Sequence, residues 1–271
     1  AVLWERSWAN FIYVSNYTHG NDANILKIGW SLCIEEHFYL ALPLVLWAVF
    51  RVRREWLRIA LLSSGIALPL LFRFYRVYTA TRGEELLAIY NETHFRMDPL
   101  FMGVLLAFLH VRHHEWIAAF VDRFRWPVLA VAAVCFMGVL WSVVPFSTLA
   151  LYTYQYSVAT IGGAALVLHA LYVDGVLARF LGSRFFVPFA RVSYGTYLLH
   201  LFVIAVIVTA VKQLGPIDYI SVPRMFGVYL AAQVMAPAVA AVMFLGLELP
   251  LQRIGRRISS PRRIEGDGLE V

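Results

Sequence analysis

Long apolar stretches dominate this sequence, and they constrain its fold more than any motif does. A membrane-spanning helix needs roughly 20 mostly apolar residues, and only 15% of the residues here are charged, against about 25% in a typical soluble domain. Seven stretches approach the required length: residues 31–50, 56–75, 97–111, 126–145, 150–173, 193–212 and 225–249. Because they are uniformly apolar rather than alternating, they do not fit a membrane barrel. The sequence predicts an all-α transmembrane bundle of about seven spans.

The distribution of positive charge predicts the orientation of these spans. Cytoplasmic loops carry an excess of Lys and Arg. Most of the 23 such residues fall near residues 51–58, 110–125 and 174–191 and in the tail from Gln252. We therefore expect residues 1–29 to lie outside the membrane on the extracytoplasmic side and residues 30–250 to form the transmembrane domain. Residues 251–271 would be a polar cytoplasmic tail, disordered from residue 256.

Several other classes of protein are not favoured. Cys33 and Cys135 lie in apolar stretches, without the spacing of a disulfide framework or a metal site. The net charge of +6 does not predict a nucleic-acid partner, because the arginines follow the loops instead of one face. The first residues lack the basic and apolar regions of a signal peptide. They also lack an initiator methionine, so we expect the chain to begin within a longer protein.

Two adjacent acids open the first predicted span, in the stretch WSLCIEEHFYL. Ser31 is a candidate helix cap, but a capping box would need its acid at Ile34. Glu35 follows Ser31 by four residues on the same helical face, and Glu36 is rotated from it by about 100°. Two interpretations stay open: the acids complement the helix dipole at the interface, or Glu35 is a buried acid that takes part in acid–base chemistry.

Histidines and a charged pair supply the other candidates. His37 is predicted to hold a hydrogen bond, with a catalytic role as the alternative, and His200 follows Tyr194 by six residues in a similar helical sector. His200 would be a core histidine bonded to a hydroxyl, or part of a functional network. Arg96 and Asp98 are either interfacial charges or contacts to Glu35 or substrate.

Charged residues nearer the predicted cytoplasmic side have simpler expected roles. His110 and His114 have the spacing of a helical metal pair, but no third ligand accompanies them, so a solvated basic loop over HVRHHEW is favoured. Glu248 is expected to form an ion pair with Arg253 that anchors the end of the last span.

Four stretches, in order, resemble the membrane-bound acyltransferase-3 family. WSLCIEEHFYLALPL is similar to the family's W-S-L-x-x-E-x-Q-F-Y-L signature with its following proline, and HFRMDPLFMGVLLAFL to its R-x-D-x-L-x-x-G-x-L-L-A segment. FLGSRFFVPFARVSYGTYLLHLFVI matches the L-G and S-Y-x-x-Y-L-x-H segment, and FLGLELPLQRI the closing E-x-P. Each motif alone is weak, but four in the same order make a specific resemblance over almost the whole chain.

The resemblance implies an integral-membrane O-acyltransferase of a bacterial inner membrane. Such an enzyme would transfer an acyl group, typically acetyl, from acyl-CoA to a hydroxyl of a cell-surface or lipid-linked carbohydrate, with no bound cofactor, metal or nucleic acid. Carried over position by position, it implies Glu35, Glu36 and His37 as catalytic residues. The implied substrate-binding residues are Trp30, Ser31, Tyr39, Arg96, Asp98, Tyr194 and His200.

The chain departs from the family pattern in ways that matter. Family members have about ten spans, begin in the cytoplasm, and carry in the first span an Arg followed about eleven residues later by a reactive His; none of this is present. We expect the chain to be the C-terminal seven-span portion of such an enzyme, inactive in isolation. Cys33 and His37 replace the usual Ser or Ala and Gln. The alternative is a seven-span transporter or receptor-like protein that binds without reacting.

Overall fold

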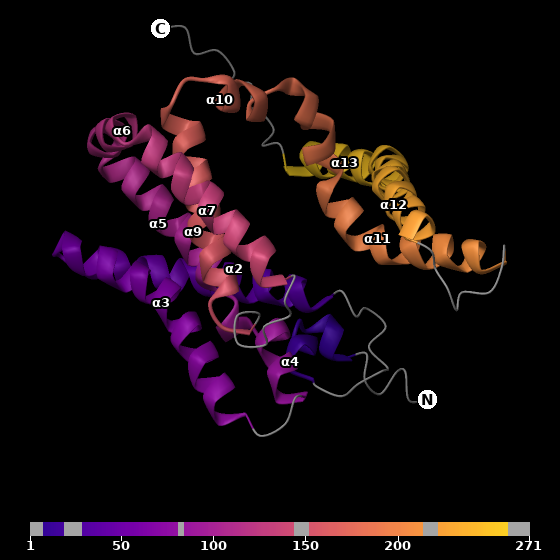
Figure 1. The fold of residues 1–271 in the computed structure, drawn as a ribbon, viewed down its shortest axis with the longest axis horizontal. Helices are drawn as coiled ribbons and strands as arrows, with labels where there is room; N and C mark the ends of the chain where they lie inside the picture. The colour runs from indigo at the N-terminus through magenta and orange to yellow at the C-terminus, as the bar shows by residue number, and fades with distance from the viewer. Residues whose placement is uncertain (1–7, 19–28, 81–83, 144–151, 214–221, 260–271) are drawn as a thin grey trace, which may run out of the picture. The chain divides into compact units, whose positions relative to one another are not determined.

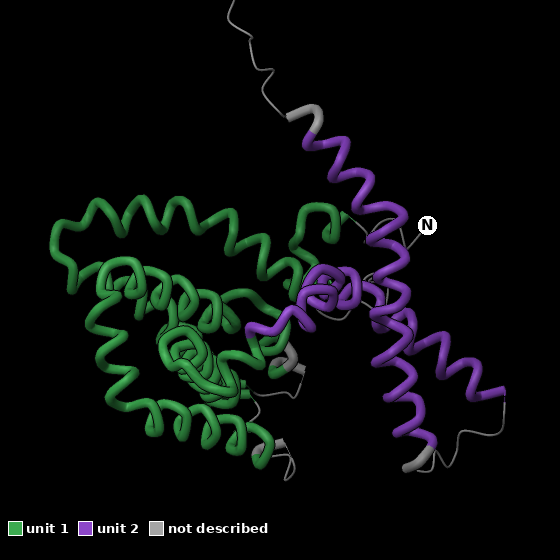
Figure 2. Tube along the Cα trace, turned by 90° about the horizontal axis from the view of Figure 1, so that it is seen from above, with its two compact units in different colours: residues 1–181 green, residues 182–271 purple. Residues whose placement is uncertain are grey.

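The computed structural model consists of helices, with no strand in the residues it describes (Figure 1). Those residues are 8–18, 29–80, 84–143, 152–213 and 222–259. The chain divides into two compact units, residues 1–181 and residues 182–271 (Figure 2). The division lies inside the transmembrane domain predicted over 30–250. The all-α fold class is confirmed.

The first unit contains the helices that position the candidate site. Their bounds are η1 Ser15–Tyr17, α2 Gly29–Arg51, α3 Glu55–Thr79, α4 Glu84–Asn91, η2 Thr93–Phe95, α5 Asp98–Arg112, α6 His114–Arg123, α7 Arg125–Val143, α9 Gln155–Tyr172 and α10 Val176–Leu181. Local sequence explains the start of α5, where Asp98 and Pro99 are the residue types favoured in a first helical turn.

Close helix approaches hold this unit together. A Cβ on Gly65 of α3 would lie 2.3 Å from the ring of Phe101 in α5, so only glycine admits that ring. Val49, Leu62 and Phe108 form a buried cluster that joins α2, α3 and α5. Helix α9 in turn packs against both α5 and α7. The unit is therefore a set of helices packed pairwise around α5 and α9.

The second unit is simpler. It contains η3 Arg184–Phe186, α11 Val187–Gln213, α12 Val222–Met243, the π-helical turn η5 Phe244–Glu248 and α13 Leu249–Ser259. Helices α11 and α12 pack through Val203, Ile207, Ala232 and Ala236. Because α12, η5 and α13 follow one another without a break, residues 222–259 form one long helical segment.

Each predicted apolar stretch contains a helix in the described residues, but fewer helices have the length and apolarity of a span. Residues 144–145 and 150–151 of two stretches lie outside the described residues. Among the described residues four segments qualify, and a fifth if α6 and α7, bent by 81°, are counted as one span. The four segments are Gly29–Arg51, Glu55–Thr79, Val176–Gln213 and Arg224–Arg256. Helix α5 falls short because it has only 15 residues. The long apolar helices are those expected of an integral membrane protein.

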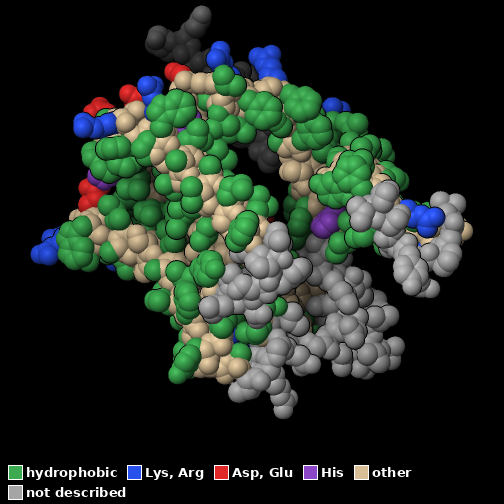
Figure 3. All heavy atoms as spheres, in the orientation of Figure 1, with side chains coloured by type: hydrophobic (Ala, Val, Ile, Leu, Met, Phe, Trp, Pro, Cys, Tyr) green, Lys and Arg blue, Asp and Glu red, His purple; other side chains and the backbone are tan. Residues whose placement is uncertain are grey.

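The surface agrees with that assignment. Hydrophobic side chains cover much of the described face in Figure 3. On α2, for example, Leu44 and Trp47 are 71% and 61% exposed. Large contiguous apolar surfaces of this kind mark contact with a membrane or another protein.

Two local predictions are corrected by the helix boundaries. The segment around His110 and His114 is not a loop, because α5 continues to Arg112 and α6 begins at His114. Residues 256–259 of the predicted disordered tail are helical, since α13 ends at Ser259. Residues 260–271 lie outside the described residues.

Candidate functional site

An ion pair between Arg73 of α3 and Asp98 of α5 is buried within the first unit. Arg73 donates from Nη1 to Oδ1 at 3.2 Å and from Nη2 to Oδ2 at 2.9 Å. Neither side chain has any exposed surface. This two-pronged geometry is the strongest form of arginine–carboxylate contact, because both N–H groups point along lone pairs.

The remaining donors of Arg73 are also satisfied. Nε donates to the Thr153 carbonyl at 2.7 Å, Nη1 to the Phe95 carbonyl, and Nη2 to the Ser157 hydroxyl at 2.6 Å. The Ser157 hydroxyl donates in turn to Asp98 Oδ2 at 2.8 Å. All five N–H groups of the guanidinium thus have an acceptor. We call these five residues the Arg73 network; it ties α3, η2, α5 and α9 together.

Arg96 lies between η2 and α5 and has a different environment. Its guanidinium carbon is 3.7 Å from the ring centre of Tyr156 and 5.7 Å from those of Trp30 and Tyr90, so three aromatic rings surround the cation. Burial lowers the pKa of Arg96, and the neighbouring Tyr156 and Asp98 oppose that shift. Its Nη1 atom is buried and has no hydrogen-bond partner among the described residues. Arg96 is therefore held by aromatic rings with a donor left over.

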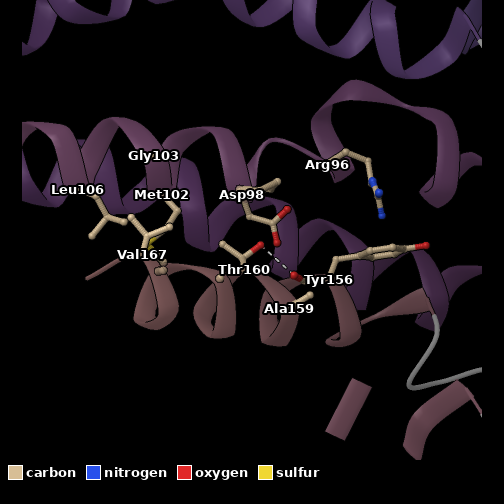
Figure 4. Close-up of a pocket in the computed structure, with 12 residues that line it drawn as sticks. Arg96, Asp98, Met102, Gly103, Leu106, Tyr156, Ala159, Thr160 and Val167 are labelled. Carbon is tan, nitrogen blue, oxygen red and sulfur yellow. Dashed lines mark hydrogen bonds between the residues drawn. The ribbon is translucent and has the colours of Figure 1, made fainter. Parts of the chain in front are cut away.

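A groove runs from Arg96 between α5 and α9 (Figure 4). It has a volume of about 380 Å³ and is lined mainly by apolar and small side chains. Arg96 and Tyr156 lie at one end, and Leu106 and Val167 lie at the other. We call this feature the α5–α9 groove.

A second polar cluster joins α2 to η1 and η2. His37 Nδ1 and the Thr93 hydroxyl are 2.7 Å apart, and Asn16 donates from Nδ2 to the same hydroxyl at 2.8 Å. Asn16 also donates to the Asn91 carbonyl at 3.3 Å. His37 Nε2 forms no hydrogen bond with the described residues. The predicted hydrogen-bonding role of His37 therefore has a partner in the structure, Thr93.

The two predicted catalytic acids lie on another side of α2. His37 follows Trp30 by seven residues, which is two helical turns, so both share the face that buries Cys33. Glu35 and Glu36 are exposed and form no hydrogen bond or ion pair with the described residues. The structure does not bring Glu35 to Arg96 or to His37.

The other predicted substrate-binding residues of α2 divide in the same way. Trp30 packs against Tyr90 with ring centres 4.6 Å apart and lies beside Arg96. Ser31 is half-buried, whereas Tyr39 is 58% exposed. Arg96 and Asp98, predicted as interfacial charges or as contacts to Glu35 or substrate, both line the groove, and Asp98 is also paired with Arg73.

Tyr194 and His200 belong to α11 in the second unit. Tyr194 is 53% exposed. His200 donates from Nδ1 to the Tyr197 carbonyl of its own helix, so its partner is a backbone carbonyl and not the expected hydroxyl.

The side chains predicted to lie on the cytoplasmic side have specific partners in the structure. His110 Nδ1 is 2.6 Å and His114 Nδ1 is 3.4 Å from the Tyr172 hydroxyl, and no set of three metal-ligating side chains occurs in the described parts of the chain. Glu248 accepts a hydrogen bond from Gln252 at 3.0 Å. The predicted partner Arg253 is wrong, because on a helix a residue faces the one four positions on rather than five.

Sequence reasoning missed Arg73, Thr93, Tyr156 and Ser157. Arg73 carried a usable signal, since a charged residue inside an apolar stretch is a functional or structural candidate by default. Thr93, Tyr156 and Ser157 carried none, because hydroxyl residues are common in every part of this chain.

Comparisons with known proteins point to one class. No family model matches the chain, and no solved structure matches it. The curated relatives that match are acyltransferases by name. They include proteins called "Putative O-acetyltransferase" from Staphylococcus aureus strains COL, MSSA476 and N315. Each is 28% identical over 109 residues, which is 40% of this chain and 18% of the relative's own length. The match supports a relationship to acyltransferases.

Proposed function

We propose that this chain is part of an integral-membrane O-acyltransferase. It would transfer an acyl group, such as acetyl, from acyl-CoA to a hydroxyl of a cell-surface or lipid-linked carbohydrate. We propose the inner membrane of a bacterium as its location, with residue 1 outside and the tail in the cytoplasm. The similarity to proteins named O-acetyltransferases supports the reaction class.

The observation that carries the proposal is that one short segment, Thr93 to Arg96, both holds His37 and carries a buried arginine donor. His37 has one ring nitrogen held by Thr93, and Arg96, three residues further along the chain from Thr93, has a buried N–H with no partner among the described residues. Acyl transfer needs a base for the hydroxyl proton and a donor for the oxyanion. With Nδ1–H donating to Thr93, the His37 Nε2 lone pair is the base and Arg96 is the oxyanion donor.

The reaction balances without any further reagent. The acceptor oxygen forms a bond to the thioester carbonyl carbon while its proton moves to His37 Nε2. The C–S bond then breaks, and the departing thiolate takes up the proton from the imidazolium. Trp30, on the same face of α2 as His37, is proposed to line the approach of the acceptor hydroxyl. Glu35 and Glu36 lie on another side of the helix and take no part in this step.

Transfer of radiolabelled acetyl from acetyl-CoA to carbohydrate tests the proposal. Membranes would contain the complete reading frame that includes this sequence. We expect His37→Ala and Arg96→Gln each to reduce transfer at least about a hundredfold, the size of effect seen for a general base or an oxyanion donor. Glu115→Gln, an exposed acid on α6, is the matched control and should retain full transfer. Normal transfer by both His37→Ala and Arg96→Gln would overturn these roles.

A further inference from the structure

The shape of the α5–α9 groove suits a single extended chain. Its lining extends from Asp98 to Leu106 on α5 and from Tyr156 to Val167 on α9. At the rise of an α-helix these segments are about 12 and 17 Å long. The groove is therefore long relative to its volume of about 380 Å³.

Two glycines keep the groove open, and helix packing does not explain them. A Cβ added to Gly103 or to Gly163 would meet no atom within 4 Å. Gly162, the neighbour of Gly163, differs: a Cβ there would lie 2.9 Å from the Cys135 Cβ of α7. Glycine destabilises a helix interior relative to alanine. Gly162 allows α7 to pack closely, whereas Gly103 and Gly163 line the groove and leave open the space that a side chain there would occupy.

The polar end of the groove indicates which polar group a bound ligand would carry. Arg73 and Asp98 neutralise each other, and Arg96, which also lines this end, forms no ion pair with a carboxylate of the described residues. Its unpartnered Nη1 would donate to an oxygen atom. The rest of the lining, including Met102 and Leu106, offers apolar contact. The complementary ligand is an alkyl chain that ends in a carboxylate or an acyl carbonyl.

We infer that the α5–α9 groove binds a medium-length acyl chain, with its carbonyl or carboxylate oxygen at Arg96, and that Gly103 and Gly163 set the chain length that fits. Calling this ligand the acyl donor rests on the proposed function; the binding itself does not. The inference extends the donors beyond acetyl.

Photo-crosslinking of the complete chain in nanodiscs tests the inference without requiring transfer. The probe is decanoic acid with a diazirine near the end of its chain, and labelled peptides are located by mass spectrometry. We expect labelling of α5 and α9 that decanoic acid and decanoyl-CoA suppress. Decanol, which lacks the acyl head, and acetyl-CoA, which lacks the chain, should not suppress it. If only decanoic acid suppresses the labelling, the bound chain comes from a free fatty acid. If only decanoyl-CoA does, it comes from an acyl-CoA.

A variant that fills the groove, compared with one that adds the same side chain elsewhere, provides a second test. Gly163→Leu should reduce labelling about tenfold or more, because it removes space for several methylene groups. Gly138→Leu on α7 introduces the same side chain into open space outside the groove and should leave labelling unchanged. Labelling that is insensitive to Gly163→Leu, or that decanol suppresses as well as decanoic acid does, would overturn the inference. Specific labelling without any acetyl or decanoyl transfer would uphold the groove and count against the proposed function.

Discussion

His37 and Thr93 are 56 residues apart in the chain, yet their side chains approach to 2.7 Å. The same hydroxyl accepts a hydrogen bond from Asn16, so Thr93 joins three separate segments of the first unit. This places η2 and the following Arg96 beside the N-terminal part of α2.

Thr93→Val should destabilise the protein, because valine keeps the volume and removes the hydroxyl that both His37 and Asn16 need. We expect a loss of about 1–3 kcal/mol in the free energy of unfolding, the cost of leaving a buried polar group without its partner. Thr93→Ser retains the hydroxyl and should stay close to the parent protein. Chemical denaturation in detergent followed by tryptophan fluorescence measures the difference, and equal loss in both variants would contradict this role of the hydroxyl.

Breaking the ion pair of the Arg73 network should lower the free energy of unfolding more than Thr93→Val does. Asp98→Asn leaves Arg73 as an uncompensated buried charge, for which we expect a loss of about 3–5 kcal/mol. Thermal unfolding in detergent is the measurement. Removing both charges, in Arg73→Met with Asp98→Leu, should be less harmful than Asp98→Asn alone.

The exposed pair of Glu55 and Arg112 is the control for that experiment. Their side chains are 38% and 52% exposed and lie 3.3 Å apart. Arg112→Gln should therefore change stability by no more than about 1 kcal/mol. A comparable loss in Arg112→Gln and Asp98→Asn would mean that burial does not govern the strength of these pairs.

Gly65→Ala should be unfavourable although alanine is the better helix former. The new Cβ would lie 2.3 Å from the Phe101 ring, so the ring or the helix must move. We expect a loss of about 1–3 kcal/mol, typical of overpacking. Adding Phe101→Leu should recover part of it. Gly138→Ala, where the Cβ meets open space, should be neutral or stabilising in the same assay.

The environment of His94 predicts how the stability of the protein depends on pH. Burial lowers its pKa below the ordinary value of 6.5, while Glu92 raises it and Arg76 lowers it further. The unfolded chain therefore binds a proton more readily than the folded one just below pH 6.5, so the free energy of unfolding should increase with pH through that range and level off above it. His94→Gln should flatten this part of the pH profile. Parallel profiles for the parent and the variant would show that another group is responsible.

The helices could be predicted from the sequence, but most of the site could not. Apolar stretches such as 56–75 are helical whatever surrounds them, because helices are the structure that satisfies the backbone in lipid. The number of spans was less predictable, since α5 is short and α6 and α7 meet at a sharp bend. A side-chain network depends instead on which helices become neighbours.

The Arg73 network illustrates why its contacts could not be predicted from the sequence. Asp98 was singled out by its motif, but its partner Arg73 lies 25 residues away on another helix, and Ser157 lies 59 residues away. No helical period connects such positions. Which side of α2 each side chain lies on was easier to predict. The spacing of Glu35, Glu36 and His37 indicates different faces of the helix, and in the structure the two acids are exposed whereas His37 is half-buried.

The satisfied guanidinium of Arg73 has a consequence for how the protein is made. Helix α3 leaves the ribosome before its acceptors on η2, α5 and α9 have been synthesised, so Arg73 first meets the bilayer alone. Inserting one arginine at mid-helix costs roughly 2.5–3.5 kcal/mol at the translocon. Its position close to the end of Glu55–Thr79 lessens that penalty, since a long side chain near a helix end can reach the interface. Stable burial must then wait until α9 arrives, which makes completion of this bundle a late, post-insertion step in biogenesis.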